Sequence, residues 1–419
     1  MARPLLVIFV TAEAAREGRL VHLDDKFVEG MALYCREWDG QVRVVMPEAP
    51  APPPFSHARD PTALGFDLVL MPPATPPGAL LPPEAGMVLG SADSAAQLGL
   101  ADLCRARGVP LVFGIEYTLG TRLRIARMDP ARNAARRLWS AGWNLRQEPR
   151  RRAALARADG VQMNGFPAAA AYAGLNRRSL LYLDNRMTAA MMATPAEMAA
   201  RAARHARRAP LRLIHSGRLE PMKGAHLIAP LVAALDAAGM TYSLDIYGEG
   251  SVLPALKAAL AALGHRAGGK EHVRLHRPLP FADGLVPVSR READLFVSLH
   301  TQSDPSCSYI EAMGCGLPVV GFANRMLAAL VACGGGGGDS GTPVNGGGTG
   351  STNTSVWFIT WGDRSTHLLH PKGTPVGLSH RDLGEVRSLL SGPLPTTDTQ
   401  LVHFTAELTN LEKEVRHTP

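Results

Sequence analysis

Long apolar runs are missing from this chain of 419 residues. No stretch reaches the roughly 18 to 20 apolar residues that a membrane-spanning helix needs. The residues that follow Met1 also lack the apolar core of a secretory signal peptide. We therefore expect a cytoplasmic protein that does not cross a membrane.

Cysteine is scarce, and its spacing is irregular. The five cysteines form no CxxC pair and no zinc-ligand pattern; they are Cys35, Cys104, Cys307, Cys315 and Cys333. Such usage is typical of a reduced protein without a metal cluster. We expect no metal and no bound cofactor in the functional site.

The charges are unbalanced, with 44 Lys and Arg against 37 Asp and Glu, or a net charge of +7. This excess indicates an anionic partner: a nucleotide, a phospholipid surface or a nucleic acid. No nucleic-acid-binding motif accompanies the charge, so we expect no nucleic acid partner. The length suffices for two domains, each with its own core.

Apolar runs alternate with helical patterns through the first half of the chain. Strands are predicted at residues 5–10, 42–46, 67–71, 87–90, 111–115, 158–164 and 180–185. Asp24 or Asp25 can cap a helix, and another helix is expected around residues 95–107. This alternation predicts an α/β fold with a doubly wound parallel sheet, whose ligands bind at the carboxyl ends of the strands.

One stretch in the second half combines a strand, a polar loop and a helix start. The apolar strand at residues 294–299 precedes a loop, a helix that carries Glu311, and a further strand at 319–322. A helix N-terminus after a strand is suited to an anion, because its first N–H groups lack partners. A carboxylate one turn inside that helix is better placed to accept hydrogen bonds from ribose hydroxyls.

A second stretch places two cations after a predicted strand. Gly217-Arg218 and Lys223-Gly224 follow the strand at residues 211–216 and precede an apolar helix. An arginine can bind a diphosphate with two hydrogen bonds, and a lysine adds a compact point charge. The alternative is a pair of surface cations that flank a turn.

Together these stretches resemble the retaining glycosyltransferases of the GT-B fold known as group 1. Glu311-Ala312-Met313, Gly316, Pro318 and Val319-Val320 are similar to the second half of their Glu-x7-Glu motif. The first Glu of that motif falls on Ser303, and Asp304 follows one position later. Gly217-Arg218-Leu219 and Lys223-Gly224 match a second family motif. The likeness is specific over residues 210–325 and looser over 1–185.

The resemblance implies two Rossmann-like domains, at residues 1–190 for the acceptor and 191–335 for the nucleotide-sugar donor. It implies that Arg218 and Lys223 stabilise the diphosphate leaving group while Glu311 holds the ribose. Further donor-binding residues are implied at Gly217, Gly248, Arg277, Asp304, Ser306, Cys307 and Ser308. For Cys307, a buried small residue is the alternative to any thiol chemistry.

Two features of the first domain bear on the acceptor. Glu116 and Tyr117 follow the strand at 111–115, where many relatives place a histidine, and Glu116 could bind an acceptor hydroxyl or pair with Arg122 or Arg124. The segment from Arg122 to Arg157 mixes arginines with Trp139 and Trp143. This mixture suits an anionic membrane interface; the alternative is a solvated face with the tryptophans in the core.

The tail at residues 336–419 is rich in Gly, Thr and Ser and departs from the family. A strand at 356–361 and a weak helix at 382–390 are predicted within it. The tail is interpreted either as a flexible linker with a small appendage or as an altered segment that leaves the donor domain incompletely closed.

The predicted function is transfer of a hexose-type sugar from an NDP-sugar donor to a saccharide or lipid-linked acceptor, with retention and without a metal. Such an enzyme would serve cell-surface or exopolysaccharide synthesis, in the cytoplasm or peripherally on the inner face of the membrane. The alternatives are a catalytically impaired nucleotide-sugar-binding protein, a sugar-nucleotide epimerase or phosphorylase on the same fold, and a membrane-surface adaptor. A phosphorylase of the pyridoxal type would need a Schiff-base lysine, and this chain has no matching motif.

Overall fold

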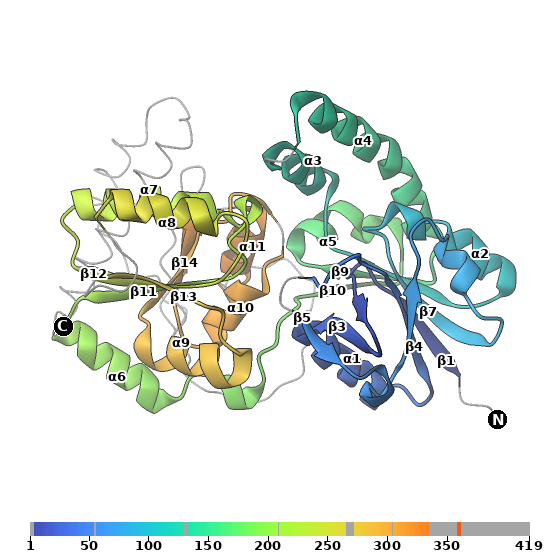
Figure 1. The fold of residues 1–419 in the computed structure, drawn as a ribbon, viewed down its shortest axis with the longest axis horizontal. Helices are drawn as coiled ribbons and strands as arrows, with labels where there is room; N and C mark the ends of the chain where they lie inside the picture. The colour runs from blue at the N-terminus through green and yellow to red at the C-terminus, as the bar shows by residue number, and fades with distance from the viewer. Residues whose placement is uncertain are drawn as a thin grey trace. The chain divides into compact units, whose positions relative to one another are not determined.

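The computed structural model describes residues 4–53, 56–129, 132–207, 209–264, 272–303, 305–322, 324–334 and 358–361. The chain divides into two compact units, Met1–Asp184 and Asn185–Pro419, each built on a parallel sheet covered by helices (Figure 1). The sequence placed this division near residue 190. Most of the predicted tail, with its expected helix at 382–390 and any contact it makes, lies outside the described residues.

Unit 1 contains a seven-stranded sheet in the order β10-β9-β8-β7-β1-β4-β6. All of its neighbouring strands are parallel, as the alternating sequence pattern predicted. The strands are β1 (Leu5–Phe9), β4 (Val42–Pro47), β6 (Asp67–Met71), β7 (Ala85–Ser91), β8 (Leu111–Ile115), β9 (Gly160–Asn164) and β10 (Ser179–Tyr182).

The central strand β1 is buried along its whole length and supplies both faces of the core. Leu5, Val7 and Phe9 pack on the face covered by α2 (Leu100–Arg107), α4 (Ala134–Arg157) and α5 (Phe166–Tyr172). Leu6 and Ile8 pack on the opposite face with α1 (Asp25–Glu37). Side chains alternate between the faces of a strand, so a continuous apolar run is what such a doubly covered strand requires.

A small antiparallel sheet was not predicted. It consists of β2 (Ala15–Glu17), β3 (Leu20–Asp24) and β5 (Ser56–Arg59). Val21 and Leu23 are buried in the core beside α1, whereas His22 between them is half-buried. Asp24 ends β3 and caps α1, because its carboxylate accepts a hydrogen bond of 3.1 Å from the Phe27 N–H.

Unit 2 contains a six-stranded parallel sheet in the order β13-β12-β11-β14-β15-β16. Its strands are β11 (Leu211–Ser216), β12 (Tyr242–Tyr247), β13 (Val273–His276), β14 (Leu295–Ser298), β15 (Val319–Phe322) and β16 (Phe358–Trp361). The last strand agrees with the strand expected at 356–361 and pairs with β15.

Helices cover both faces of this sheet (Figure 1). On one face lie α7 (Ile228–Ala237) and α8 (Leu253–Ala262), which close the main core of the unit. On the other face lie α6 (Pro195–Ala206) and α9 (Val286–Glu292), and α10 (Cys307–Gly314) and α11 (Arg325–Gly334) follow the last central strands.

A buried arginine attaches α6 to the body of unit 2. Arg201 is only 4% exposed, and its guanidinium donates hydrogen bonds to the carbonyl oxygens of Ala293, Cys315 and Gly316. A buried charged donor is tolerated when such acceptors satisfy it. The Ala/Arg composition of α6 gave no signal for this anchor.

Glu197 lies in the first turn of the same helix and makes contacts that depend on pH. Its carboxylate accepts hydrogen bonds from the Thr194 N–H at 2.9 Å and from Arg290 at 2.8 Å. Burial acts to raise the pKa of Glu197, but these hydrogen bonds, together with that from Arg291, outweigh it and lower the pKa from 4.5 to about 2.

We predict that Glu197 makes stability fall in acid. Its folded-state pKa lies below the unfolded value, so its contribution is present above pH 4.5 and is lost as the pH falls toward 2. The difference in urea unfolding free energy between wild type and Glu197→Gln should be constant from pH 7 to about 5 and should shrink below that. A difference that stays constant down to pH 3.5 would contradict this assignment.

Candidate functional site

The predicted donor-binding residues of unit 2 share one edge of its sheet. Gly217 and Arg218 follow β11, Gly248 follows β12, Arg277 follows β13, and the loop to α10 follows β14. These four strands are adjacent and parallel, so their carboxyl ends meet at the same edge. In open α/β sheets this edge is where ligands bind.

Two glycines let the loops after β11 and β12 pack closely. A Cβ atom at Gly248 would overlap the Gly217 carbonyl oxygen, and one at Gly250 would overlap the Leu219 carbonyl. The Leu219 N–H donates to Glu249 O at 2.8 Å, and the Val252 N–H donates to Leu219 O at 3.0 Å. These contacts hold the backbone that carries Arg218.

Sequence reasoning missed Glu220, which completes this packing. Its carboxylate accepts a hydrogen bond of 2.9 Å from the Ser251 N–H and another from the Ser251 hydroxyl. The carboxylate thus holds the loop after β12 against the loop after β11. In the sequence, only the position of Glu220 directly after Gly217-Arg218-Leu219 could have indicated this role.

The two predicted cations differ in their surroundings. The Arg218 side chain is exposed and has no hydrogen-bond or ion-pair partner among the residues that the structure describes. Lys223 is half-buried. The next residue, Gly224, has φ +75°, and a Cβ there would overlap the Leu299 carbonyl oxygen. This approach holds Lys223 beside the end of β14.

The loop after β14 leads to the start of α10. Ser306 is buried at the N-cap position, but its side chain makes no capping hydrogen bond; its hydroxyl oxygen lies 2.6 Å from that of Ser308. Cys307 is half-buried, so the alternative of a fully buried small residue does not describe it. Asp304 lies outside the described residues.

Glu311 lies further along α10 and is 8% exposed. Its carboxylate accepts hydrogen bonds from Arg186 Nε at 3.0 Å and from a second Arg186 nitrogen at 3.5 Å. The guanidinium carbon of Arg186 lies 3.8 Å from the centroid of the Phe281 ring. A carboxylate has about four lone-pair positions, so Glu311 can still accept ribose hydroxyls while Arg186 remains bound. Arg186 was not recognised from the sequence.

Ser303, which occupies the position of the first motif Glu, has a structural partner. Its hydroxyl oxygen accepts a hydrogen bond of 3.1 Å from the Arg325 N–H at the start of α11. The Asn324 side chain accepts from the next two N–H groups of this helix, at 3.0 Å each. In the same loop Gln302 is fully buried, and its amide nitrogen and oxygen have no partner among the described residues.

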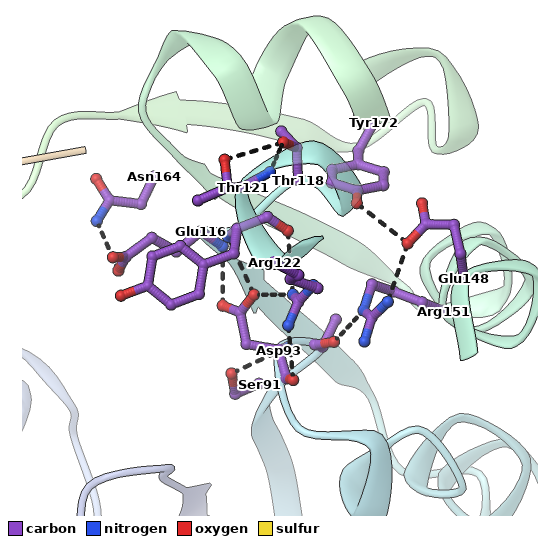
Figure 2. Close-up of polar contacts among 12 residues, drawn as sticks. Ser91, Asp93, Glu116, Thr118, Thr121, Arg122, Glu148, Arg151, Asn164 and Tyr172 are labelled. Atoms are coloured by element: carbon purple, nitrogen blue, oxygen red, sulfur yellow. Dashed lines mark hydrogen bonds and ion pairs between the residues drawn. The ribbon is translucent and has the colours of Figure 1, made fainter. Parts of the chain in front are cut away.

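The predicted acceptor-side residues lie at the carboxyl end of β8 in unit 1 (Figure 2). The Asp93 carboxylate accepts hydrogen bonds from the backbone N–H groups of Glu116 at 2.9 Å and Tyr117 at 3.1 Å. The Asn164 amide donates to the Glu116 carboxylate at 3.3 Å. Arg122 forms its ion pair with Asp93, so the pairing of Glu116 with Arg122 was wrong, whereas its pairing with Arg124 stays a prediction.

A second buried arginine supports this loop from α4. Arg151 is 2% exposed and donates to Ala92 O at 2.8 Å and to the Glu148 carboxylate at 2.9 Å (Figure 2). The Tyr172 hydroxyl donates to the same carboxylate at 3.4 Å, and burial raises the pKa of Tyr172 to about 12. The side chains of Arg122 and Arg151 therefore bind groups inside unit 1, although the sequence analysis placed both arginines in a basic segment that was expected to be exposed.

The alternative that placed the tryptophans of this segment in the core was also wrong. Trp139 is 69% exposed and Trp143 is 45% exposed. No helix within the described part of the chain combines the length and apolar content that crossing a membrane requires.

Comparisons with known proteins agree with this architecture. Residues 210–342 match the family model described as "Glycosyl transferases group 1", and residues 328–406, largely outside the described part, match that of "Major capsid protein GP7". A search among curated proteins gave no significant match.

Several solved structures share the fold across the whole chain. Anabaena Alr3699/HepE in complex with UDP is 13% identical with a TM-score of 0.53, over 99% of this chain and 97% of that one. The same protein with UDP-glucose is 14% identical with a TM-score of 0.52, over 98% and 97%. At this identity the likeness concerns the fold: an α/β chain of two Rossmann-like domains, as in GT-B glycosyltransferases.

We predict that Gly224 tolerates alanine worse than Gly239 does. The two glycines have similar φ, +75° and +68°, but a Cβ at Gly239 would meet nothing within 4 Å. Gly239→Ala should therefore cost only the left-handed backbone term of about 1–2 kcal/mol. Gly224→Ala should add about 1–3 kcal/mol for the overlap with Leu299. Equal losses of urea unfolding free energy in the two variants would refute the close approach.

Proposed function

We propose that this protein is a glycosyltransferase that moves a hexose-type sugar from an NDP-sugar to a saccharide or lipid-linked acceptor, with retention. The observation that carries the proposal is the exposed side chain of Arg218 at the carboxyl edge of the unit 2 sheet, which has no hydrogen-bond or ion-pair partner within the described part of the chain. Lys223 and the start of α10 share this edge, within the segment that matches the group 1 family model.

The chemistry follows from the charge that develops in the reaction. The bond between the sugar's anomeric carbon and the β-phosphate oxygen breaks, and the phosphate leaves with the bonding electrons. The acceptor oxygen forms the new bond to the anomeric carbon, and its proton passes to the departing phosphate oxygen. Arg218 and Lys223 act as fixed cations for this diphosphate, so their stabilisation grows as the negative charge appears. We propose that these side chains make a metal unnecessary.

The remaining donor contacts are assigned to the loops and to α10. Glu311 holds the ribose, with Arg186 fixing its orientation, and Gly217, Gly248 and Arg277 contribute from the strand ends. Ser306, Cys307 and Ser308 face the phosphates and the sugar from the start of α10. The UDP complexes of the similar HepE fold motivate uridine as the first base to test.

Glu116 and Tyr117 in unit 1 are assigned to the acceptor. The hydrogen bonds from their N–H groups to Asp93 fix the loop that presents them. We further propose a cytoplasmic location, partly on the inner membrane face, and a role in cell-surface or exopolysaccharide synthesis.

A specific observation favours a second candidate, a nucleotide-sugar-binding protein with impaired catalysis. Ser303 stands where the motif has its first Glu, and its hydroxyl is engaged by the α11 N-terminus. A side chain held in this way contributes less to a sugar than a carboxylate would. Binding and turnover must therefore be measured separately.

The first test is a thermal-shift panel with UDP, GDP, ADP and their sugars. A ligand at a hundred times its Kd should stabilise the protein by about 2.7 kcal/mol. We expect a shift with one nucleotide family, and its loss in Arg218→Ala. Because Arg218 is exposed and unpartnered within the described chain, the ligand-free variant should melt like wild type. Arg105→Ala, at an exposed arginine of α2, is the matched control and should keep the shift. No shift with any nucleotide would refute the donor site.

The second test measures turnover of the nucleotide sugar that binds. Release of the nucleoside diphosphate, with and without candidate saccharide acceptors, should fall about 100- to 1,000-fold in Lys223→Ala, as expected for loss of one transition-state donor. Binding without release in wild type would favour the impaired binder. Interconversion of sugar epimers without nucleotide release would identify an epimerase instead.

A further inference from the structure

We propose that the outward face of α4 docks on an anionic phospholipid bilayer. The observation is a group of large apolar side chains that the fold leaves in solvent. The exposed fractions are 76% for Leu138, 69% for Trp139, 45% for Trp143 and 53% for Leu145. The rings of Trp139 and Trp143 stack, with centroids 5.8 Å apart and planes within 10° of parallel. These four residues are called the apolar stripe below.

Helical geometry places the stripe on a little less than half of the helix circumference. Trp139 and Trp143 are four positions apart and nearly aligned, as are Leu138 and Leu145 at seven positions, and the tryptophan pair lies roughly 100° or more round the helix from the leucine pair. The opposite side of the helix carries the buried residues Ser140, Gln147, Arg151, Ala154 and Leu155. The stripe is therefore a second apolar surface, separate from the face that packs into unit 1.

The charges around the stripe have one sign. The exposed residues of α4 include no acid, and they include the arginines Arg136, Arg146, Arg150, Arg152 and Arg157. The single carboxylate of the helix, Glu148, is half-buried and accepts hydrogen bonds from Arg151 and Tyr172. Two of these arginines lie near carboxylates: Arg152 is 3.8 Å from Glu148, and Arg157 is 3.4 Å from the exposed Asp102 of α2. Arg136, Arg146 and Arg150 have no acidic partner among the described residues, so they carry the attraction to an anionic surface.

This combination fits a lipid surface better than other anionic partners. Tryptophan rings sit at headgroup depth, leucine side chains enter the acyl boundary, and arginines meet the lipid phosphates. A nucleic acid would use the arginines and leave Leu138 and Leu145 without a role. Each arginine near an anionic bilayer strengthens binding about fivefold.

The docking face is rigidly connected to the predicted acceptor loop. Arg151 of α4 donates to Ala92 O, and the adjacent Asp93 accepts the N–H groups of Glu116 and Tyr117 (Figure 2). A bilayer on the outer face of α4 would thus be fixed relative to this loop. The biological purpose of this docking, delivery of a lipid-linked acceptor, rests on the proposed function. The binding of α4 to the bilayer does not depend on it.

The experiment is flotation of the full chain with vesicles of neutral phosphatidylcholine, or of phosphatidylcholine with a quarter phosphatidylglycerol. We expect binding to the anionic vesicles that weakens with added salt. Trp139→Ala/Trp143→Ala should reduce the partition coefficient about tenfold or more. Arg146→Gln/Arg150→Gln should reduce it about 25-fold, at about fivefold for each arginine. The matched controls Leu33→Ala, at a half-exposed leucine of α1, and Arg105→Gln should bind like wild type.

Several results would overturn the proposal. These are no binding to anionic vesicles, equal binding to neutral ones, or stripe variants that bind like wild type. Sedimentation that shows self-association of wild type, abolished by Trp139→Ala/Trp143→Ala, would assign the stripe to a second copy of the chain. The nucleotide thermal shift should be intact in all stripe variants, so failure of the docking face and failure of the donor site are read from different measurements.

Discussion

The candidate donor-binding edge of unit 2 depends on the close approach of Gly224 to the Leu299 carbonyl. This approach joins the cation-bearing loop after β11 to the loop after β14, so Lys223 and the start of α10 are placed by a single backbone contact. The neighbouring loops after β11 and β12 are joined in the same way, through Gly217, Gly248 and Gly250. A parallel sheet supplies the edge, but only residues without a Cβ allow its loops to pack so closely. The site is therefore a property of backbone packing before any ligand-binding side chain is considered.

The sequence was sufficient where the signal is local. The buried strands of both sheets are continuous apolar runs, and Asp24 caps α1 as expected because capping involves only neighbouring residues. The small antiparallel sheet escaped prediction because its strands pair across a long separation, from β3 to β5. Arg201, Arg151 and Arg186 escaped for the same reason: their acceptors are distant in sequence or are carbonyl oxygens that have no residue signature. The candidate site residues were predicted through a family motif, whereas their supporting contacts could be found only in the fold.

Ser303 has one meaning as a position in the family motif and another as a hydrogen-bonding residue in the fold. As a motif position it signals a lost carboxylate, which favours weaker sugar contacts. In the fold its hydroxyl accepts the first N–H of α11, beside the Asn324 cap that serves the next two. A glutamate there would have to leave this short contact or reach past it. The serine thus adds to the stability of the α11 start while removing a charged group from the loop.

The arginines that give the chain its positive net charge fall into two groups: some lie inside the two units, and others are exposed to solvent. The side chains of Arg201, Arg151 and Arg122 donate to carbonyls and carboxylates inside their units, so they are not available to contact an anionic partner. The arginines that remain exposed on α4 surround apolar side chains, and no acid lies among them. Leaving the apolar surface of a tryptophan in water is unfavourable in free energy, and a face that only contacts solvent has no use for such a side chain. Arg152 and Arg157 lie near carboxylates, but Arg136, Arg146 and Arg150 have no acidic partner among the described residues. A face that combines exposed tryptophans with such arginines is explained by a partner that is both anionic and apolar, which describes a phospholipid interface more closely than any free nucleotide or sugar.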